Sequence, residues 1–249
     1  LENYEIGMKS DLLDRTLRFN ATAYYSEISD LQTSRFDPSN VAFLVFIENV
    51  GDAEIRGLDA EFSWLPTPNL NIGGAISLLD TEITALNPQL QGVAVPEGSE
   101  LPFAPEFSGS LRARYDFDVP ALGGRGYVSG NARYTGESKS GITGNAFFVE
   151  DTAQLLYGRG TGLKIESEGG EFVGGGGTVF DSGRYVHEDY ILLDVAVGVE
   201  VNDWRAELFV DNLTDERADL NINTLEFTPK VVTNRPRTVG LRFTYDVSR

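Results

Sequence analysis

The chain offers few side chains with the chemistry of a catalytic site. It contains no cysteine, so disulfides and thiolate metal sites are excluded. His187 is the single histidine, and a Ser–His–Asp arrangement would have to use it. No Gly-x-Ser-x-Gly elbow accompanies it, and no carboxylate pair stands out among the 38 acidic residues. The sequence therefore predicts that this protein is not an enzyme and names no catalytic residue and no cofactor.

Two glycine-rich runs raise the question of a phosphate-binding loop. They are Gly158–Gly162 and Gly174–Gly177. A phosphate-binding loop needs a following Lys-Ser/Thr and a helix whose N-terminus faces the anion. Neither run has them, so both are interpreted as flexible loops.

An acidic run follows the stretch AELFVDNLTDERA at 206–218. Asp211, Asn212, Asp215, Glu216 and Asp219 could hold calcium by residue type. Their spacing misses the alternate acidic positions and central glycine of a calcium loop. A solvated acidic exit from a strand is the favoured interpretation, and no metal site is predicted.

The candidate substrate-binding residues lie in the longest predicted loop or where it rejoins a strand. They are Tyr157, Arg159, Arg184, Tyr185 and His187. Arginine and tyrosine side chains suit an anionic ligand. Loops are also where binding selectivity is usually built.

Charge and hydropathy narrow the class of protein that could carry such loops. The formal net charge of -18 argues against a nucleic-acid partner, because phosphates would repel this surface. No stretch of 18 apolar residues exists, so no transmembrane helix is predicted. A membrane barrel stays open, because its strands alternate and give no hydropathy peak.

A period of two indicates about nine strands and no convincing amphipathic helix. The predicted strands are 2–10, 16–34, 43–65, 70–84, 105–117, 126–138, 188–201, 204–214 and 236–247. In the last of them Leu241 and Phe243 face one side, while Arg242 and Thr244 face the other. Such two-sided strands fit either a soluble β-sandwich or a membrane barrel.

The lengths of the connections between the predicted strands distinguish a soluble β-sandwich from a membrane barrel. Links at 11–15, 66–69, 118–125 and 202–203 are short. Links at 35–42, 85–104, 139–187 and 215–235 are mostly long, and the two classes alternate along the chain. In an antiparallel meander this places tight turns at one end and long loops at the other, as in outer-membrane barrels. Aromatic residues near strand ends (Trp64, Tyr115, Phe117, Trp204 and Tyr245) agree with this prediction.

The predicted inward face carries six arginines, Arg18, Arg112, Arg114, Arg133, Arg205 and Arg242. They could pair with Glu61, Asp116 and Glu207 across neighbouring strands. Alternatively, they could contact a domain inside the barrel or an anionic cargo. Cross-strand pairing is the favoured interpretation.

Five stretches resemble the C-terminal barrel region of TonB-dependent outer-membrane receptors, in the order usual for that family. They are NYEIGMKSDLLDRTLRFNATAYYSEISDLQ (Asn3–Gln32), ENVGDAEIRGLDAEFSWLPTPNLNIGGAISLLDTEI (Glu48–Ile83), LPFAPEFSGSLRARYDF (Leu101–Phe117), the NLTD strand exit and NRPRTVGLRFTYDV (Asn234–Val247). The resemblance implies an all-β fold, an antiparallel transmembrane β-barrel segment of about nine strands within a barrel of about 22 strands. Residues 1–249 would form its C-terminal part, with the plug domain and TonB box outside this chain. Family members also commonly end on an aromatic residue, whereas this chain ends at Arg249.

The resemblance also implies a function. The expected activity is TonB-dependent active transport of a scarce nutrient, most often a ferric siderophore, across the bacterial outer membrane. The expected partners are outer-membrane lipid and lipopolysaccharide, the plug domain, TonB with its inner-membrane energising complex, and the small-molecule cargo. The alternative is a passive porin-like channel, and a soluble β-sandwich binding module comes third. The sequence does not identify the cargo.

Overall fold

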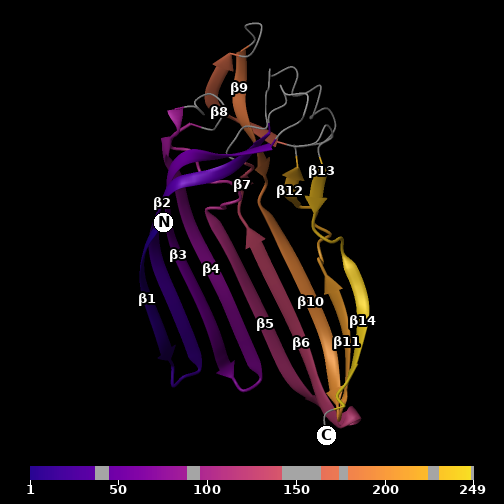
Figure 1. Ribbon diagram of the computed structural model, residues 1–249. Coiled ribbons are helices and arrows are strands. Elements are labelled where there is room, and N and C mark those ends of the chain that lie inside the picture. Colours follow the sequence, from indigo (N-terminus) through magenta and orange to yellow (C-terminus); the bar gives the residue numbers. More distant parts are fainter. Residues whose placement is uncertain (37–44, 89–95, 142–163, 174–178, 224–229, 248–249) are drawn as a thin grey trace.

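The computed structural model describes residues 1–36, 45–88, 96–141, 164–173, 179–223 and 230–247. Its main element is an antiparallel sheet of nine strands that follow one another in chain order (Figure 1). The strands are β1 (Glu2–Leu12), β2 (Leu17–Phe36), β3 (Val45–Thr67), β4 (Leu70–Leu86), β5 (Phe107–Val119), β6 (Gly124–Thr135), β10 (Tyr190–Val201), β11 (Trp204–Asp211) and β14 (Thr238–Tyr245). The prediction of an all-β meander with about nine strands is confirmed. Among the described strands, β1 and β14 each have one neighbour, so the barrel is not closed by this chain.

The two ends of the sheet differ as the link lengths predicted. Short turns join β1 to β2, β3 to β4 and β10 to β11, and a single 3-10 turn at Pro120–Leu122 joins β5 to β6. All of them lie at one end, at the bottom of Figure 1, and the long connections lie at the other. We call these the turn end and the loop end.

The loop end contains structure that the sequence did not predict. Within the predicted loop 139–187, β9 (Val179–His187) pairs with β8 (Lys164–Val173) and with β7 (Ser138–Lys139). Within the predicted loop 215–235, β12 (Asp219–Asn223) and β13 (Lys230–Thr233) form a hairpin. The connections there are thus partly built from β-structure.

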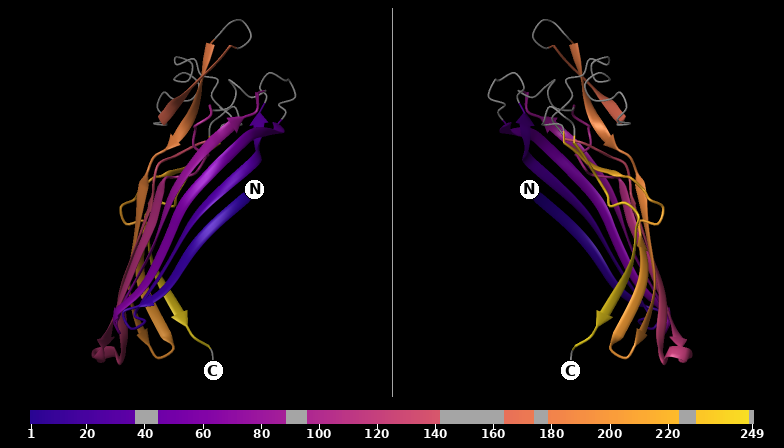
Figure 2. Two further views of the ribbon diagram at one scale, coloured as in Figure 1. Left: turned by 90° about the vertical axis from the view of Figure 1, so that its left-hand side faces the viewer. Right: turned by 90° about the vertical axis from the view of Figure 1, so that its right-hand side faces the viewer.

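The sheet is a single layer with an apolar face and a polar face, and no second layer of described residues covers either one (Figure 2). The register of each strand pair places apolar side chains opposite apolar ones and polar side chains opposite polar ones. On the apolar face Leu208 is opposite Leu241, and Ala206 is opposite Phe243. Leu241 is 66% exposed and Phe243 69%. Such a large exposed apolar face needs a non-aqueous environment.

Aromatic side chains form two belts on the apolar face. The turn-end belt consists of Trp64, Tyr115, Phe117, Trp204 and Tyr245, and the loop-end belt of Tyr4, Tyr25, Phe107 and Tyr134. The rings of Trp204 and Tyr245 lie 4.6 Å apart. Phe107 and Phe117 are ten positions apart on β5, about 33 Å at about 3.3 Å per residue. With a strand tilt of about 40°, this gives an apolar band about 25 Å tall, the height found in outer-membrane barrels.

Aromatic rings also pack across five of the interfaces between neighbouring strands, which we call seams. In each pair the ring lies over a glycine directly opposite it in the next strand of the sheet. The pairs are Tyr24 with Gly57, Phe62 with Gly74, Phe117 with Gly126, Tyr127 with Gly198 and Phe209 with Gly240. A Cβ at any of these glycines would come within 2.1 to 2.6 Å of the ring. Glycine is therefore the residue that lets each ring lie flat against the sheet.

The buried apolar cluster lies near the loop end instead of between two layers. Val50 and Ile83 are fully buried and pack with Leu31, Leu86 and Leu101. Within the described part of the chain, no helix is long and apolar enough to cross a membrane.

Candidate functional site

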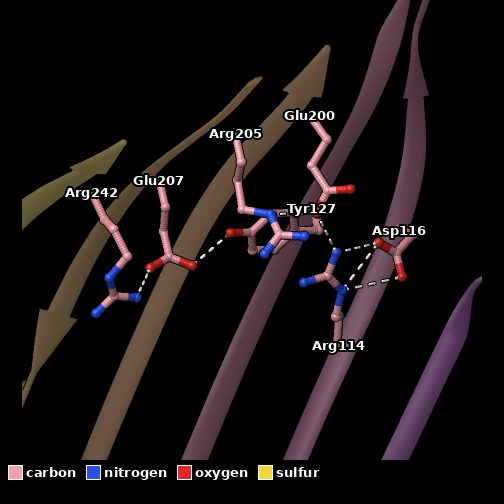
Figure 3. A network of polar contacts seen from close by, with 7 residues as sticks. All are labelled: Arg114, Asp116, Tyr127, Glu200, Arg205, Glu207 and Arg242. Carbon is pink, nitrogen blue, oxygen red and sulfur yellow. Dashed lines mark hydrogen bonds and ion pairs between the residues drawn. The ribbon is translucent and has the colours of Figure 1, made fainter. Parts of the chain in front are cut away.

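The polar face of the sheet is the first candidate surface, because it lines the side opposite the exposed apolar face. Near the turn end it carries a network of ion pairs that runs over β5, β6, β10, β11 and β14 (Figure 3). Arg114 Nη2 lies 2.8 Å from Asp116 Oδ1 and 3.4 Å from Glu200 Oε1. Arg205 Nε lies 2.8 Å from the same Glu200 oxygen. Two arginines therefore share one glutamate across three strands.

Tyr127 connects this half of the network to the other. The Arg114 guanidinium lies over the Tyr127 ring, 3.7 Å from its centroid. The Tyr127 hydroxyl donates a hydrogen bond of 2.5 Å to Glu207, which also pairs with Arg242. The seven residues drawn in Figure 3 carry three positive and three negative charges, so the network neutralises itself.

Other charges on this face are also matched. Arg18 pairs with Asp11 at 3.1 Å, and Arg133 pairs with Asp194 at 3.0 Å. Five of the six inward arginines pair with a carboxylate. Arg112 is the exception among the described residues. Of the three predicted partners only Asp116 and Glu207 are used, and the Arg114–Asp116 pair lies within β5 instead of across neighbouring strands. Glu61, a predicted arginine partner, instead accepts a hydrogen bond from Asn20.

The second candidate surface is the loop end, where the predicted substrate-binding residues were placed. Arg184, Tyr185 and His187 do come together, at the end of β9. These residues are 1%, 2% and 5% exposed, so they are buried among the segments of the loop end. Tyr157 and Arg159 lie outside the described residues. Contact with a ligand stays a prediction for all five.

The buried position of these residues follows from the segments that meet around them. Arg184 Nη1 donates to the carbonyl oxygen of Glu100 at 2.7 Å, and the Tyr185 amide donates to Ser140 Oγ at 3.0 Å. Lys139 also pairs with Glu100 at 3.3 Å. The strand end thus joins the segment between β4 and β5 to the segment after β6.

His187 is held from two further sides. Its Nδ1 lies 2.9 Å from the carbonyl oxygen of Asp219, and its ring lies 5.3 Å from that of Phe103. Because a carbonyl oxygen only accepts, Nδ1 carries a hydrogen. Nε2 makes no hydrogen bond to a described residue. None of these contacts supplies the nucleophile and carboxylate of a hydrolytic triad.

The acidic strand exit at 211–219 forms a clasp, not an ion site. Asn212 is 5% exposed, and its amide nitrogen donates to the carbonyl oxygens of Glu216 and Arg235 at 2.9 and 3.0 Å. Asn234 accepts from the Ala218 amide at 2.8 Å and donates to Glu216. We call Asn212, Asn234 and the backbone that they bind the asparagine clasp. It ties the exit of β11 to the segment before β14.

Asp215 completes the asparagine clasp outside the strands. It accepts from the Arg237 amide at 2.8 Å and pairs with Arg217 at 3.3 Å. The hydrogen bond from the Arg237 backbone, followed by the nearby arginines, lowers the pKa of the Asp215 carboxyl. Sequence reasoning named these residues but missed the clasp, because Asn234 and Arg237 lie about twenty positions further on.

No group of three or more acidic or histidine side chains in the described residues is arranged to hold a metal ion. The runs Gly158–Gly162 and Gly174–Gly177 lie outside the described part of the chain, so the flexible-loop interpretation stays a prediction.

Comparison with known proteins gives a match over most of the chain. Residues 1–213 match the family model described as "TonB dependent receptor-like, beta-barrel". The metal-pseudopaline receptor CntO of Pseudomonas aeruginosa is 33% identical over 114 residues, which is 46% of this chain and 14% of that receptor. The chain thus matches only a small part of the length of this relative.

Solved structures share the fold over nearly the whole chain. The siderophore receptor PiuA of Acinetobacter baumannii gives a TM-score of 0.61 at 18% identity, covering 98% of this chain and 28% of that receptor. The ferric yersiniabactin uptake receptor FyuA of Yersinia pestis gives a TM-score of 0.65 at 17% identity, covering 99% and 30%. The family and these structural neighbours are transport receptors, not enzymes. With its nine-stranded sheet, apolar outer face and matched residues 1–213, the chain belongs to the TonB-dependent receptor β-barrel family.

Proposed function

We propose that this chain forms the C-terminal part of a receptor that actively imports a scarce nutrient across the bacterial outer membrane. The observation that carries this proposal is the register of the nine-stranded sheet, which shifts only within the pairings of β3 with β2 and β4 and keeps one face apolar and exposed and the other charged. That division suits a wall between lipid and a water-filled lumen. The rest of the barrel, to about 22 strands, and a plug in its lumen complete the proposed receptor.

The proposed cargo is a metal chelate, most often a ferric siderophore. Two of the structural neighbours are named as siderophore receptors or uptake receptors, and the relative CntO is named as a metal-chelate receptor. In this proposal the loop end captures the chelate and TonB, energised from the inner membrane, drives its passage past the plug. Lipid and lipopolysaccharide surround the two aromatic belts.

Uptake of radioactive iron in the source bacterium tests this function. Under metal limitation, deletion of the receptor gene is expected to abolish uptake of the chelate that the receptor serves. Deletion of the TonB gene is expected to abolish it equally, because the plug would no longer be displaced. Uptake that persists without TonB would instead show a passive porin-like channel.

A further inference from the structure

His187 bridges three connections of the loop end. It is the last residue of β9 and lies directly opposite Ser138 on β7, so it belongs to the connection between β6 and β10. Its ring lies 5.3 Å from that of Phe103, in the connection between β4 and β5. Its Nδ1 lies 2.9 Å from the carbonyl oxygen of Asp219, the first residue of β12, in the connection between β11 and β14. We call the contacts of the ring with Phe103 and Asp219 the histidine latch.

The histidine latch links strands that the backbone does not join. Among the described strands, β9 pairs with β7 and β8, whereas β12 pairs with β13 alone. β9 and β12 nevertheless contact each other at the loop end (Figure 1). The His187 ring therefore supplies a hydrogen bond between two strands that share no ladder of backbone hydrogen bonds.

The contacts of the ring fix which of its nitrogens carries a hydrogen. Nδ1 faces a carbonyl oxygen, which only accepts, so Nδ1 is the donor. Nε2 is buried and has no hydrogen-bond partner among the described residues. A neutral ring leaves one acceptor unpaired there. A protonated ring would leave an unpaired donor that carries positive charge, and burial of a charged group without a partner costs more than burial of a neutral one.

The charged side chains around the ring do not pair with it in the described part of the chain. Those on the segments that meet at His187 are Glu97, Glu100, Glu106, Glu137, Lys139, Arg184, Glu188, Asp189, Glu216, Arg217 and Asp219. Two of the carboxylates have other contacts: Glu100 pairs with Lys139 at 3.3 Å, and Asp189 accepts a hydrogen bond from Tyr134 at 3.1 Å. The Asp219 contact uses the backbone carbonyl and not the carboxylate. A proton on Nε2 would thus find no carboxylate in place to receive it.

We propose that the histidine latch is a pH-sensitive switch, which holds β12 against β9 while the ring is neutral and releases it when the ring is protonated. Histidine is the side chain that ordinarily changes charge between about pH 5 and 8, and this chain contains a single histidine. Once charged, the ring gains by turning towards water, and this movement breaks its hydrogen bond to Asp219. A histidine that is buried in its neutral form stabilises the fold at higher pH and loses this effect as the pH falls.

The release is expected to be local. Arg184 holds the carbonyl oxygen of Glu100 through a guanidinium that keeps its charge throughout this pH range. The asparagine clasp uses amide groups, which do not titrate, and its Asp215 responds only to stronger acid. The β12–β13 hairpin should therefore loosen from β9 while the nine-stranded sheet and the asparagine clasp stay in place.

Hydrogen exchange of the full-length receptor in detergent, measured by mass spectrometry at pH 7.5 and pH 5.5, tests the switch. After correction for the intrinsic pH dependence of exchange, peptides that cover β12 are expected to exchange about tenfold faster or more at pH 5.5, the effect of one unpaired buried group. Peptides from β5 and β6 should keep their protection. Unchanged exchange in β12 would overturn the proposal, and so would an equal increase throughout the sheet.

Two variants of the histidine separate the switch from other effects of acid. His187→Asn keeps a neutral donor close to the position of Nδ1, so β12 is expected to stay protected at both pH values. His187→Ala removes the donor, so β12 is expected to exchange fast already at pH 7.5. Heat-modified mobility in gel electrophoresis checks that each barrel is assembled. A pH step that survives in His187→Asn, or wild-type protection at pH 7.5 in His187→Ala, would contradict the switch.

Glu188→Gln is the matched control. Glu188 follows the histidine directly and is exposed, so its loss removes a neighbouring carboxylate and leaves the ring in place. The pH step in β12 should persist in this variant, and its disappearance would assign the step to the carboxylate and overturn the proposal. The measurement uses no cargo and no TonB. Its failure would therefore leave the proposed transport function untouched, and failure of the uptake experiment would leave the histidine latch untouched.

Discussion

At the scale of single residues, the asparagine clasp explains why a well-patterned strand ends in a polar run. Asn212 adopts a left-handed backbone at φ 53° and is buried with its side-chain amide fully engaged. Asparagine tolerates this conformation better than most residues, and its amide can donate and accept at once. The NLTD stretch is thus a structural device that joins β11 to β14.

Removal of the Asn212 amide is expected to destabilise the loop end. Asn212→Ala removes one of the two side-chain donors to the carbonyls of Glu216 and Arg235, because Asn234 still donates to both. It also leaves the Glu216 amide without its acceptor, and an unsatisfied group costs about 1–3 kcal/mol. Urea unfolding of the full-length receptor in detergent measures the change. Thr214→Ala is the control, because Thr214 is exposed in the same segment. Equal stability of the two variants would contradict the role of the clasp.

Asp215 gives the same region a pH dependence. Its pKa is lowered in the folded protein, so it contributes stability above the pKa of an unfolded aspartate, near 4. That contribution is lost as pH falls through the lower folded pKa. We expect the hydrogen-exchange protection factor of the Arg237 amide to fall between pH 5 and strongly acid pH. In Asp215→Ala, which has no side-chain acceptor, the protection should be low already at neutral pH, and protection equal to wild type there would contradict this assignment.

At the scale of elements, the nine long strands could be predicted from the sequence, and the loop-end strands could not. Alternation is a local signal, and Leu241, Arg242 and Phe243 display it without reference to any partner. The buried state of His187 depends on Phe103 and Asp219, which lie far away along the chain. The sequence could therefore name these residue types but not their structural contacts, and contact with a ligand stays a prediction.

The ring–glycine pairs at the seams could not be predicted from the sequence either, because a ring and its glycine are recognisable as a pair only once the register is known. Tyr127 and Gly198 are 71 positions apart but directly opposite each other in the sheet. The backbone conformation of the turn after β1 could not be predicted from residue type either. Leu13, Asp14 and Arg15 all have positive φ, although none is a glycine.

Gly198→Ala tests the seam beneath the ion-pair network. The new Cβ would lie 2.4 Å from the Tyr127 ring, which also holds Arg114 and Glu207. Displacement of the ring is expected to destabilise the folded receptor by about 1–3 kcal/mol, the usual range for overpacking. Gly130→Ala is the control, since its Cβ would meet only the Asp194 carbonyl at 3.8 Å. Heat-modified mobility in gel electrophoresis measures both, and equal effects would contradict the seam.

At the scale of the whole molecule, every part of the interpretation depends on which solvent each face meets. The wall has no second layer of described residues, so neither face can be a protein core by itself (Figure 2). The acidic charge of the chain does not conflict with lipid contact. The polar wall is nearly neutral through its ion pairs, and many carboxylates lie at the loop end, outside the apolar band.

Leu111→Arg tests the solvent of the apolar face at its centre. Leu111 lies midway between the two belts on β5 and is 52% exposed. An arginine there would stand at the midplane of the bilayer and is expected to cost about 2–4 kcal/mol. Unfolding of the full-length receptor from lipid vesicles measures this cost. Thr22→Arg is the matched control, because Thr22 lies on the polar face directly opposite Asp59, where an arginine gains a partner. If Leu111→Arg were as well tolerated as Thr22→Arg, the apolar face would not contact hydrocarbon, and the barrel wall would have to be assigned to another environment.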